Sequence, residues 1–164
     1  MVLALRYVYL LTLVIWLGGM IVLGALVAPT TFQVLPAHEP VTGRELAGEL
    51  FGSILARFNY VAYGAGGLLL ATLFAMRLLG PRPRAVGVRA AIVAAMLLIS
   101  LYSGLVVLQQ IDAVQAESGV PPSRLAAGDA RRVRFDGLHL LSMRLMLVTM
   151  AGALVLLYWE ARET

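Results

Sequence analysis

The sequence contains no cysteine and no lysine, and charged residues make up only 13% of its 164 positions. Without cysteine, neither a disulfide nor a thiolate metal site can form. The sequence also lacks the HExxH, GxSxG, P-loop and EF-hand patterns, which carry the chemistry of many hydrolases, nucleotide-binding proteins and metal-binding proteins. We therefore favour a protein that is not an enzyme, and we predict no bound cofactor outside the haem alternative given below.

The basic residues, 13 in number, are all arginines, and the formal net charge is +4. A basic balance can indicate nucleic-acid binding, but here the arginines lie between apolar runs and not along one face. A membrane explains this distribution better, because arginine is common at the ends of membrane spans. We therefore expect the lipid bilayer, and no nucleic acid, as a partner.

Hydrophobic residues make up 60% of the chain, against roughly half in a soluble domain. They are gathered in four runs, each of about the 20 residues that a helix needs to cross a bilayer. We interpret the first run as a retained span and not as a signal peptide, because it is long and no small-residue cleavage site follows it. The sequence thus predicts an all-α, integral membrane four-helix bundle in a single domain, 1–164. The predicted spans are residues 7–28, 58–79, 90–109 and 139–159.

The segment between the first two spans has a helical pattern of its own. Thr42 is a candidate helix cap, and side chains of one helical face follow it at intervals of four. These side chains are Glu45, Glu49, Ser53 and Arg57. We expect a partly helical segment along the membrane interface that continues into the second span. Pro121 and Pro122 form a second helix-start signal, so the fourth helix is expected to begin well outside the membrane.

With four spans, both termini and the loop between the second and third spans share one side of the membrane, which we call face X; the opposite side is face Y. Face X holds Arg6 and Arg89 against Glu160, and its loop "RLLGPRPRAVGVR" gathers four arginines near two helix ends. By the positive-inside rule, this favours a cytoplasmic face X. We predict a multi-pass protein of a bacterial inner membrane with both termini in the cytoplasm.

Polar side chains of three helices reach one depth near face Y. Counting about 20 residues back from Trp159 places His139 where the fourth helix enters the membrane, and Arg144 lies about 7–8 Å inside. The same count brings polar residues of the second and third spans to this level. The candidate polar layer consists of His139, Ser142, Arg144, Arg57, Asn59, Asp112, Gln109 and Glu49.

Two interpretations of this layer are open. In one, Arg57 and Arg144 extend to the headgroups, and the other residues are the wet ends of helices. In the other, the layer is a binding site, because the polar stripes that contain His139 and Arg144 diverge and cannot both face lipid. We expect Arg144 to pair with a carboxylate, since an unpaired charge at that depth is costly. The candidate carboxylates are Asp112, Asp136 and Glu49. Small residues such as Ser100 and Gly104 are interpreted as packing positions that let helices approach closely.

Three stretches resemble a known family of four-helix membrane proteins that includes transmembrane protein 205 and bacterial proteins of unknown function. They are "WLGGMIVLGALVAPTTFQVLP" (16–36), "AGELFGSILARFNYVAYGAG" (47–66) and "FDGLHLLSMRLML" (135–147). The resemblance implies the fold and the membrane location, and no activity. The family pattern often has an asparagine shortly after the serine of the third stretch; Met146 stands there, so a role for that amide is not carried over.

The first of these stretches is also distantly similar to the first helix of copper-resistance D-type membrane domains and of membrane protoporphyrinogen oxidases. Those families carry a histidine before the tryptophan, where this chain has tyrosines. The only histidines, His38 and His139, both fall on face Y, so a haem or metal site built from this pair is one alternative.

We predict a non-enzymatic integral membrane protein whose face Y polar layer binds a partner helix, a lipid headgroup or a small ligand. One alternative is a haem- or quinone-linked redox accessory protein that uses His139. Another is a small transporter or channel subunit. That role requires a homo-oligomer or a membrane-complex partner, because the bundle is too small to contain inverted repeats.

Overall fold

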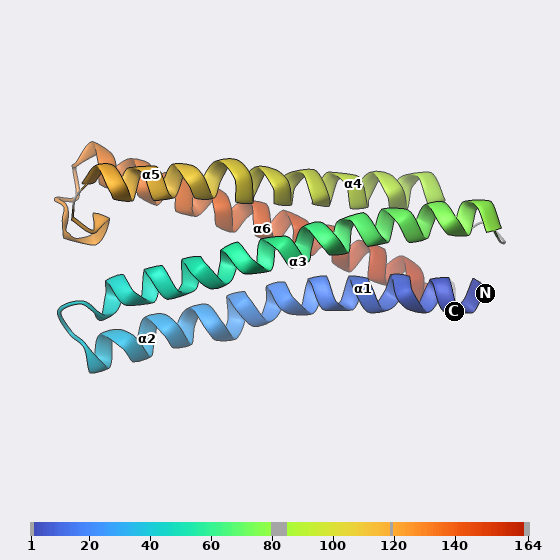
Figure 1. Ribbon diagram of the computed structural model, residues 1–164, viewed down its shortest axis with the longest axis horizontal. Coiled ribbons are helices and arrows are strands. Elements are labelled where there is room, and N and C mark those ends of the chain that lie inside the picture. Colours follow the sequence, from blue (N-terminus) through green and yellow to red (C-terminus); the bar gives the residue numbers. More distant parts are fainter. Residues whose placement is uncertain (1, 80–84, 119, 163–164) are drawn as a thin grey trace.

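Four long helical rods run side by side in the computed structural model, which describes residues 2–79, 85–118 and 120–162 (Figure 1). Arg82 and Arg84, which contribute to the charge of the face X loop, lie outside the described residues. The elements in chain order are α1 (Val2–Val22), the π-turn η1 (Leu23–Val27), α2 (Ala28–His38), α3 (Gly43–Leu79), α4 (Val86–Tyr102), the π-turn η2 (Ser103–Val107), α5 (Leu108–Ser118), the 3₁₀ turn η3 (Pro122–Arg124) and α6 (Ala130–Arg162). The described part of the chain contains no strand, so the predicted all-α class is confirmed.

Each rod is long and apolar enough to cross a membrane. The rods are Leu3–His38, Gly43–Leu79, Val86–Ser118 and Ala130–Arg162, with 36, 37, 33 and 33 residues. At 1.5 Å per residue they measure about 50–55 Å, whereas the hydrocarbon core of a bilayer is about 30 Å thick. The four predicted spans each fall within one rod, so the remaining length extends the bundle beyond the membrane at face Y.

The helical pattern between the first two spans belongs to two of these rods. The first rod continues through α2, and α3 begins at Gly43 and runs into the second span without a break. The carbonyl oxygen of Thr42 accepts the backbone N–H groups of Glu45 and Leu46, each at 3.0 Å, so Thr42 occupies the cap position that its place in the sequence indicated.

The last helix begins outside its predicted span, as expected, but at Ala130. Pro121 and Pro122 lead instead into the separate turn η3. The carboxylate of Asp129 accepts the backbone N–H of Arg131 at 2.9 Å and pairs with its guanidinium at 2.8 Å, which caps the helix. Hydrogen bonds from this guanidinium and this N–H lower the pKa of Asp129 to about 2. The stability that this cap contributes is therefore fully present above the ordinary carboxyl pKa. It is lost as the pH falls from there through the lowered pKa of about 2.

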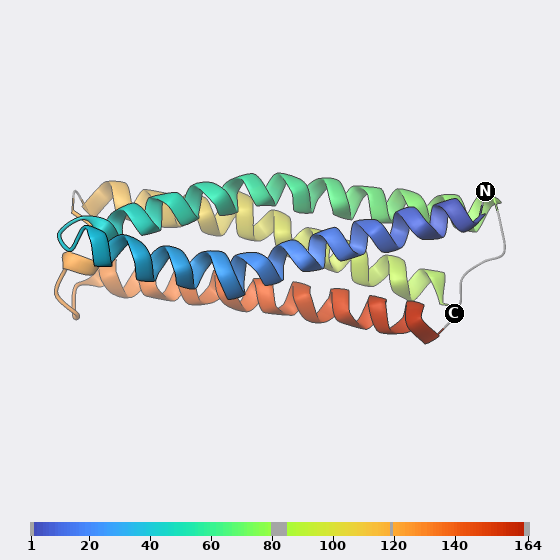
Figure 2. The same ribbon diagram turned by 90° about the horizontal axis from the view of Figure 1, so that it is seen from below.

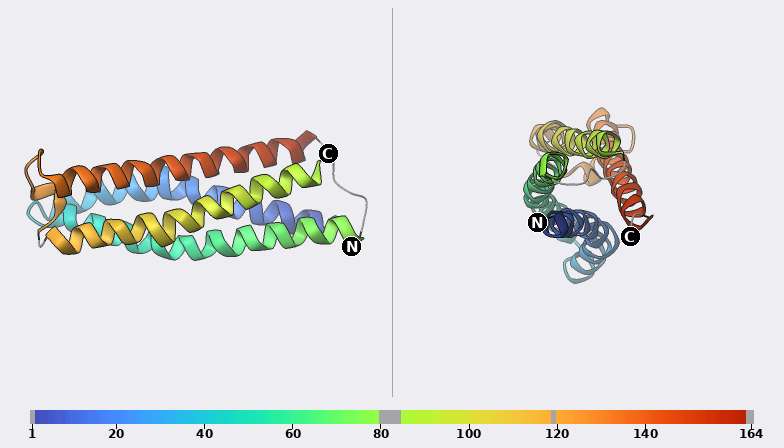
Figure 3. Two further views of the ribbon diagram at one scale, coloured as in Figure 1. Left: turned by 90° about the horizontal axis from the view of Figure 1, so that it is seen from above. Right: turned by 90° about the vertical axis from the view of Figure 1, so that its right-hand side faces the viewer.

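The face X half of the bundle is closed and densely packed. Here α1 packs on α3 and α6, and α4 packs on the same two helices, so the four rods form a ring (Figure 3, right). Leu13, Leu69, Val93 and Leu156 come from the four rods and are fully buried at its centre. Gly66 lets α3 approach α4, because a Cβ there would lie 2.8 Å from the side chain of Leu97.

The face Y half is divided into two helix pairs. There α2 packs on α3, and α5 packs on α6, while α2 and α6 have at most slight contact, as do α3 and α5 (Figures 1 and 2). The change of partners coincides with η1 in the first rod and η2 in the third. A π-turn adds a residue to one turn of a helix and commonly bends it, which is a physical reason for the separation to begin there.

A buried ion cluster closes the face X end, and it contains three of the charged residues that the sequence assigns to this face. Glu160 of α6 pairs with the guanidinium groups of Arg6 of α1 and Arg89 of α4, the latter at 2.6 Å. Arg89 is 2% exposed and Glu160 is 4% exposed. One carboxylate therefore joins three helices inside the protein. Arg6 and Arg89 must be subtracted from the free positive charge that the sequence assigned to face X.

Replacing Glu160 with glutamine should destabilise the protein strongly, because Arg89 would keep its buried charge and lose its counter-charge. Breaking one partner of a buried ion pair typically costs about 3–5 kcal/mol. We expect the midpoint of thermal unfolding in detergent, followed by circular dichroism, to fall clearly. Glu117→Gln, at an exposed position on α5, serves as the control and should leave the midpoint nearly unchanged. Equal midpoints for the two variants would contradict the role of the cluster.

Candidate functional site

A cavity of about 440 Å³, which we call the chamber, lies between the two helix pairs. Its floor is formed by Trp16, near the middle of the first predicted span, and its face Y end is formed by Phe135 and His139 of α6. Side chains from all four rods line it, most of them apolar or aromatic, and both π-turns contribute through Gly24 and Ser103. This size and composition are typical of sites for small apolar or amphipathic molecules, which occupy about 300–1,000 Å³.

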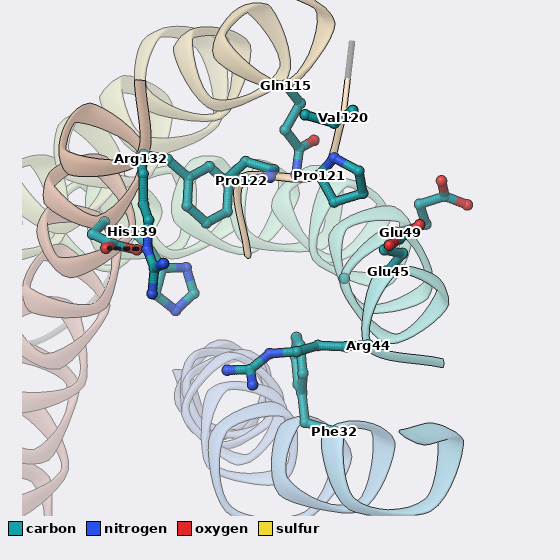
Figure 4. A pocket seen from close by; sticks show the side chains of 13 residues that line it. Phe32, Arg44, Glu45, Glu49, Gln115, Val120, Pro121, Pro122, Arg132 and His139 are labelled. Carbon is teal, nitrogen blue, oxygen red and sulfur yellow. Dashed lines mark ion pairs between the residues drawn. The ribbon is translucent and has the colours of Figure 1, made fainter. Parts of the chain in front are cut away.

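A second cavity of about 590 Å³, the vestibule, continues the chamber toward face Y (Figure 4). Phe32, Gly48, Gln115, Phe135 and His139 line both cavities, so the two are contiguous. The rest of the vestibule lining is largely charged, in contrast to that of the chamber. Its charged members are Arg44, Glu45, Glu49, Arg132 and Asp136.

Only part of the predicted polar layer lines these cavities. His139, Ser142, Asn59 and Asp112 line the chamber, and Glu49 lines the vestibule. Arg57, Gln109 and Arg144 are exposed and line neither cavity. The structure therefore brings five of the predicted residues together and places the other three elsewhere on the bundle.

Arg144 differs most from expectation. It is exposed on α6 and forms no ion pair with Asp112, Asp136 or Glu49 anywhere in the described ranges. Consecutive helical residues are rotated by roughly 100°, so Arg144 points almost opposite to Ser142, which lines the chamber. In a bilayer this side chain faces lipid, and its length lets the guanidinium reach the headgroups at face Y. The expected carboxylate pairing of Arg144 is therefore wrong.

The charges of the vestibule are not all balanced. Glu45 pairs with Arg124 at 2.6 Å, and Arg132 lies 4.0 Å from Asp136. Arg44 forms no ion pair with any residue that the structure describes, and Figure 4 shows its side chain extending from α3 across the cavity toward the side on which His139 lies. A guanidinium in this position is available to a phosphate or carboxylate group, which it binds with several donors.

Aromatic groups lie where the chamber meets the vestibule, and a polar link joins the two helix pairs beside the vestibule. The rings of Phe135 and His139 are stacked, with centroids 6.3 Å apart and planes 7° from parallel. Arg124 of η3 joins the two helix pairs, because it pairs with Glu45 and also donates a hydrogen bond to the carbonyl oxygen of Val41 at 2.9 Å. This link is partly exposed, with side chains 49% and 25% accessible for Arg124 and Glu45, so it contributes little to stability.

The two histidines are not brought together in these cavities. His38 lies on α2 with its Nδ1 3.0 Å from the carbonyl oxygen of Val34, and it lines neither the chamber nor the vestibule. Among the described residues, no group of three or more histidine or carboxylate side chains could hold a metal ion.

Three residues of this site carried no earlier functional interpretation. Ser100 and Ser103 line the chamber, although Ser100 was assigned a packing role, and Arg44 lines the vestibule. Gly104 does have a packing role, because a Cβ there would collide with the hydroxyl group of Tyr63 and lie 2.7 Å from the amide nitrogen of Asn59. The serines gave a weak signal, since isolated serines are common in membrane helices as packing positions.

One protein-family model matches a region that covers most of the first three rods. The model of the family described as Domain of unknown function (DUF4149) matches residues 11–119, which is more than half of the chain. The chain belongs to this family. In this DUF4149 member, the matched region supplies Trp16, Asn59 and Ser100, whereas α6 with His139 lies beyond it.

Comparisons of this DUF4149 protein with curated proteins and with solved structures found no match.

The absence of cysteine makes access to the chamber directly measurable with single-cysteine variants. Ser142→Cys should react with a water-soluble thiol reagent in membranes, because the vestibule connects this position with water. Leu147→Cys, on the exposed lipid-facing side of the same helix, should react at least about tenfold more slowly, since a thiol in apolar surroundings stays protonated. Mass spectrometry of the labelled protein measures both rates. Similar rates for the two positions would contradict an accessible chamber.

Proposed function

We propose that this integral membrane protein binds a membrane lipid, with the charged headgroup in the vestibule and an acyl chain in the chamber. The observation that carries the proposal is the order of polarity along one continuous cavity. Charged side chains such as Arg44 and Arg132 lie outermost, and neutral polar groups such as Asn59 and Ser142 follow. The floor is formed by the ring of Trp16, whose Nε1–H is buried and has no partner among the described residues. A phospholipid has the same order from its headgroup to its chains.

The arrangement of the helices supports access to the cavity from the headgroup region at face Y. Since α2 and α6 have at most slight contact, and α3 and α5 likewise, the cavity lies between two helix pairs that are separated on both sides (Figure 1). Because α2 and α5 lie beyond the predicted spans 7–28 and 90–109, these gaps open at the level of the headgroups at face Y. A partner helix fits less well, because a helix with its side chains is about 10–12 Å across and the chamber encloses only about 440 Å³.

The closed half of the bundle favours binding over passage across the membrane. The chamber ends at Trp16, and the ring of rods beyond it is filled by buried residues such as Leu13, Leu69 and Leu156. The transport alternative stays a prediction that depends on an oligomer. The redox alternative also stays a prediction, supported by the place of His139 at the chamber but not by a second histidine there.

The sequence supports a location for this activity. After Arg6 and Arg89 are subtracted, the positive-inside argument rests on the remaining arginines of the face X loop, and on this argument we place face X in the cytoplasm. The chamber then opens to the outer leaflet of a bacterial inner membrane. The resemblance to the transmembrane protein 205 family and to copper-resistance D-type domains also stays a prediction, and it adds no residue to the proposed site.

A phenylalanine at Gly52 should block lipid binding. Gly52 lines the chamber, and nothing lies within 4 Å of a Cβ built there, so the new ring can enter the cavity without disturbing the helix. Gly67→Phe is the matched control on α3, because its position is equally open but exposed and remote from the chamber. Native mass spectrometry of protein purified in mild detergent should show bound lipid for the parent chain and Gly67→Phe, and little for Gly52→Phe. Equal lipid occupancy in both variants would contradict the proposal.

Arg44→Gln should weaken the binding of a lipid with an anionic phosphate. A hydrogen bond to a charged group is worth about 1.5–3 kcal/mol when it is sheltered, and screening at the exposed vestibule reduces this to an expected loss of about three- to tenfold in affinity. Arg57→Gln, which removes the same charge from α3 outside both cavities, is the control and should bind normally. Titration with phosphatidylglycerol at two salt concentrations measures the effect, which should shrink at high salt. A loss of the same size in both variants would point to general surface charge instead.

A further inference from the structure

The chamber is long and narrow. On α3 its lining extends from Gly48 to Ala62, and on α6 it extends from Phe135 to Thr149. Both stretches advance by 14 residues along an uninterrupted helix, which corresponds to a length of about 21 Å at about 1.5 Å per residue. A volume of about 440 Å³ over this length gives the chamber a mean cross-section of about 21 Å².

These dimensions match one extended hydrocarbon chain. A chain whose carbons contact their neighbours at about 4.0–4.5 Å occupies a cross-section of about 16–20 Å². Two chains side by side need about twice this area. With carbon–carbon bonds of about 1.5 Å at the tetrahedral angle, a chain advances about 1.25 Å per carbon, so a length of about 21 Å holds about 17 carbons. The chamber therefore has room for one long acyl chain and not for two.

Contacts at the two π-turns join the helix pairs inside the membrane. Met146 of α6 reaches η1, where a Cβ built on Gly24 would lie 3.4 Å from its methyl group. On the other side, Asn59 of α3 packs against η2, where a Cβ built on Gly104 would lie 2.7 Å from its amide nitrogen. All four residues fall within predicted spans. The gaps between the helix pairs therefore end above these contacts, and a second chain finds no place beside the first at this depth.

The position of the gaps also favours a guest with one chain. Because the gaps open at the level of the headgroups, a chain enters the chamber only after it has left the bilayer. A single acyl chain holds a molecule in a membrane reversibly, whereas two chains anchor it stably. A single-chain amphiphile therefore moves from the bilayer into the chamber more readily than a two-chain lipid does.

Positive groups lie just beyond the face Y end of the chamber. Arg44 precedes Gly48 by one turn of α3, and Arg132 precedes Phe135 by nearly one turn of α6. These positions lie about 5–6 Å beyond the chamber along each helix. Arg44 has no ion-pair partner within the described ranges, and Figure 4 shows its side chain crossing the vestibule. An anionic group at the end of a chain in the chamber is thus within reach of a guanidinium.

We infer that the guest is a single-chain amphiphile, with its acyl chain along the chamber and an anionic phosphate or carboxylate group at Arg44. This inference rests on the proposed lipid-binding function and specifies the ligand class of the same site. A lysophospholipid and a fatty acid share this chemistry. A two-chain phospholipid can place one chain in the chamber but not the other, so it binds more weakly.

Native mass spectrometry of the protein in nanodiscs tests this inference, because a bound lipid is identified by its mass. Nanodiscs of phosphatidylcholine replace detergent, since a detergent is itself a single-chain amphiphile. Palmitoyl lysophosphatidylglycerol, dipalmitoyl phosphatidylglycerol and palmitate are added in equal amounts. We expect one single-chain molecule per protein, in at least about tenfold excess over bound phosphatidylglycerol, because the second chain of the latter stays outside the chamber.

The two single-chain probes distinguish the possible headgroups. An excess of lysophosphatidylglycerol would assign a phosphate to Arg44, and an excess of palmitate would assign a carboxylate; either result supports a single-chain guest. Gly52→Phe, whose ring enters the chamber, should remove the bound molecule in both cases. Gly67→Phe, exposed and remote from the chamber on the same helix, should retain it.

A longer side chain at the deep end should shorten the preferred acyl chain. Ser100 lines the chamber at nearly the same depth as Trp16, since each lies about 14–15 Å from the face X end of its predicted span. Ser100→Met lengthens the side chain by two bonds, so the best-bound lysophosphatidylglycerol should become shorter by about two carbons. Leu98→Met, at a position of α4 that is 66% exposed, is the control and should keep the preference of the parent.

The outcomes separate this inference from the function on which it rests. Equal binding of phosphatidylglycerol and the single-chain probes, all removed by Gly52→Phe, would overturn the single-chain inference and leave lipid binding in place. An unchanged chain-length preference in Ser100→Met would overturn the placement of the chain end at the chamber floor. If no probe binds better to the parent than to Gly52→Phe, the proposed function is overturned as well.

Discussion

The carboxylate of Glu160 holds together the end of the bundle on which the rest of the structure depends. In a bilayer, lipid chains are as apolar as leucine side chains, so burial of apolar surface alone gives little reason for helices to associate. Close packing and polar contacts must do so instead. Glu160 joins α1, α4 and α6 through Arg6 and Arg89 and is almost inaccessible. Because this end is fixed, the helices can separate at the other end without losing the ring.

The two ends of the bundle are therefore held by interactions of different strength. The face X cluster is buried, where an ion pair is costly to break. The link at face Y, between Arg124 and Glu45, is partly exposed and contributes little. Motions that widen the mouth are therefore expected to cost much less than motions that open the closed half. This asymmetry suits a cavity that exchanges its contents with one leaflet.

Much of the fold follows from the sequence, because the length and apolarity of the four runs determine the number of spans. Depth can be estimated as well, since residues can be counted along a helix, and four of the residues that this count predicts at one level, Asn59, Asp112, Ser142 and His139, line the same chamber. The rotation of each helix about its own axis is harder to predict. Ser142 and Arg144 lie at similar depths but on opposite sides of α6, and only the packing of the neighbouring helices decides which side faces inward.

Two further features lay beyond sequence reasoning for physical reasons. The π-turns η1 and η2 each add a residue to a turn, so a helical face followed along α4 changes its direction in α5. The Glu160 cluster joins residues as far apart in the chain as Arg6 and Glu160, and nothing local to either residue indicates the other.

The closed and open halves together limit what the chamber can do. A site that ends at Trp16, near mid-membrane, reaches the molecules of one leaflet only, so binding there can retain or present a lipid but gives it no path to the other side. Since chains gain little on entering an apolar cavity from a bilayer, the depth of the chamber adds little affinity by itself. Its depth instead sets which part of a guest meets which side chain.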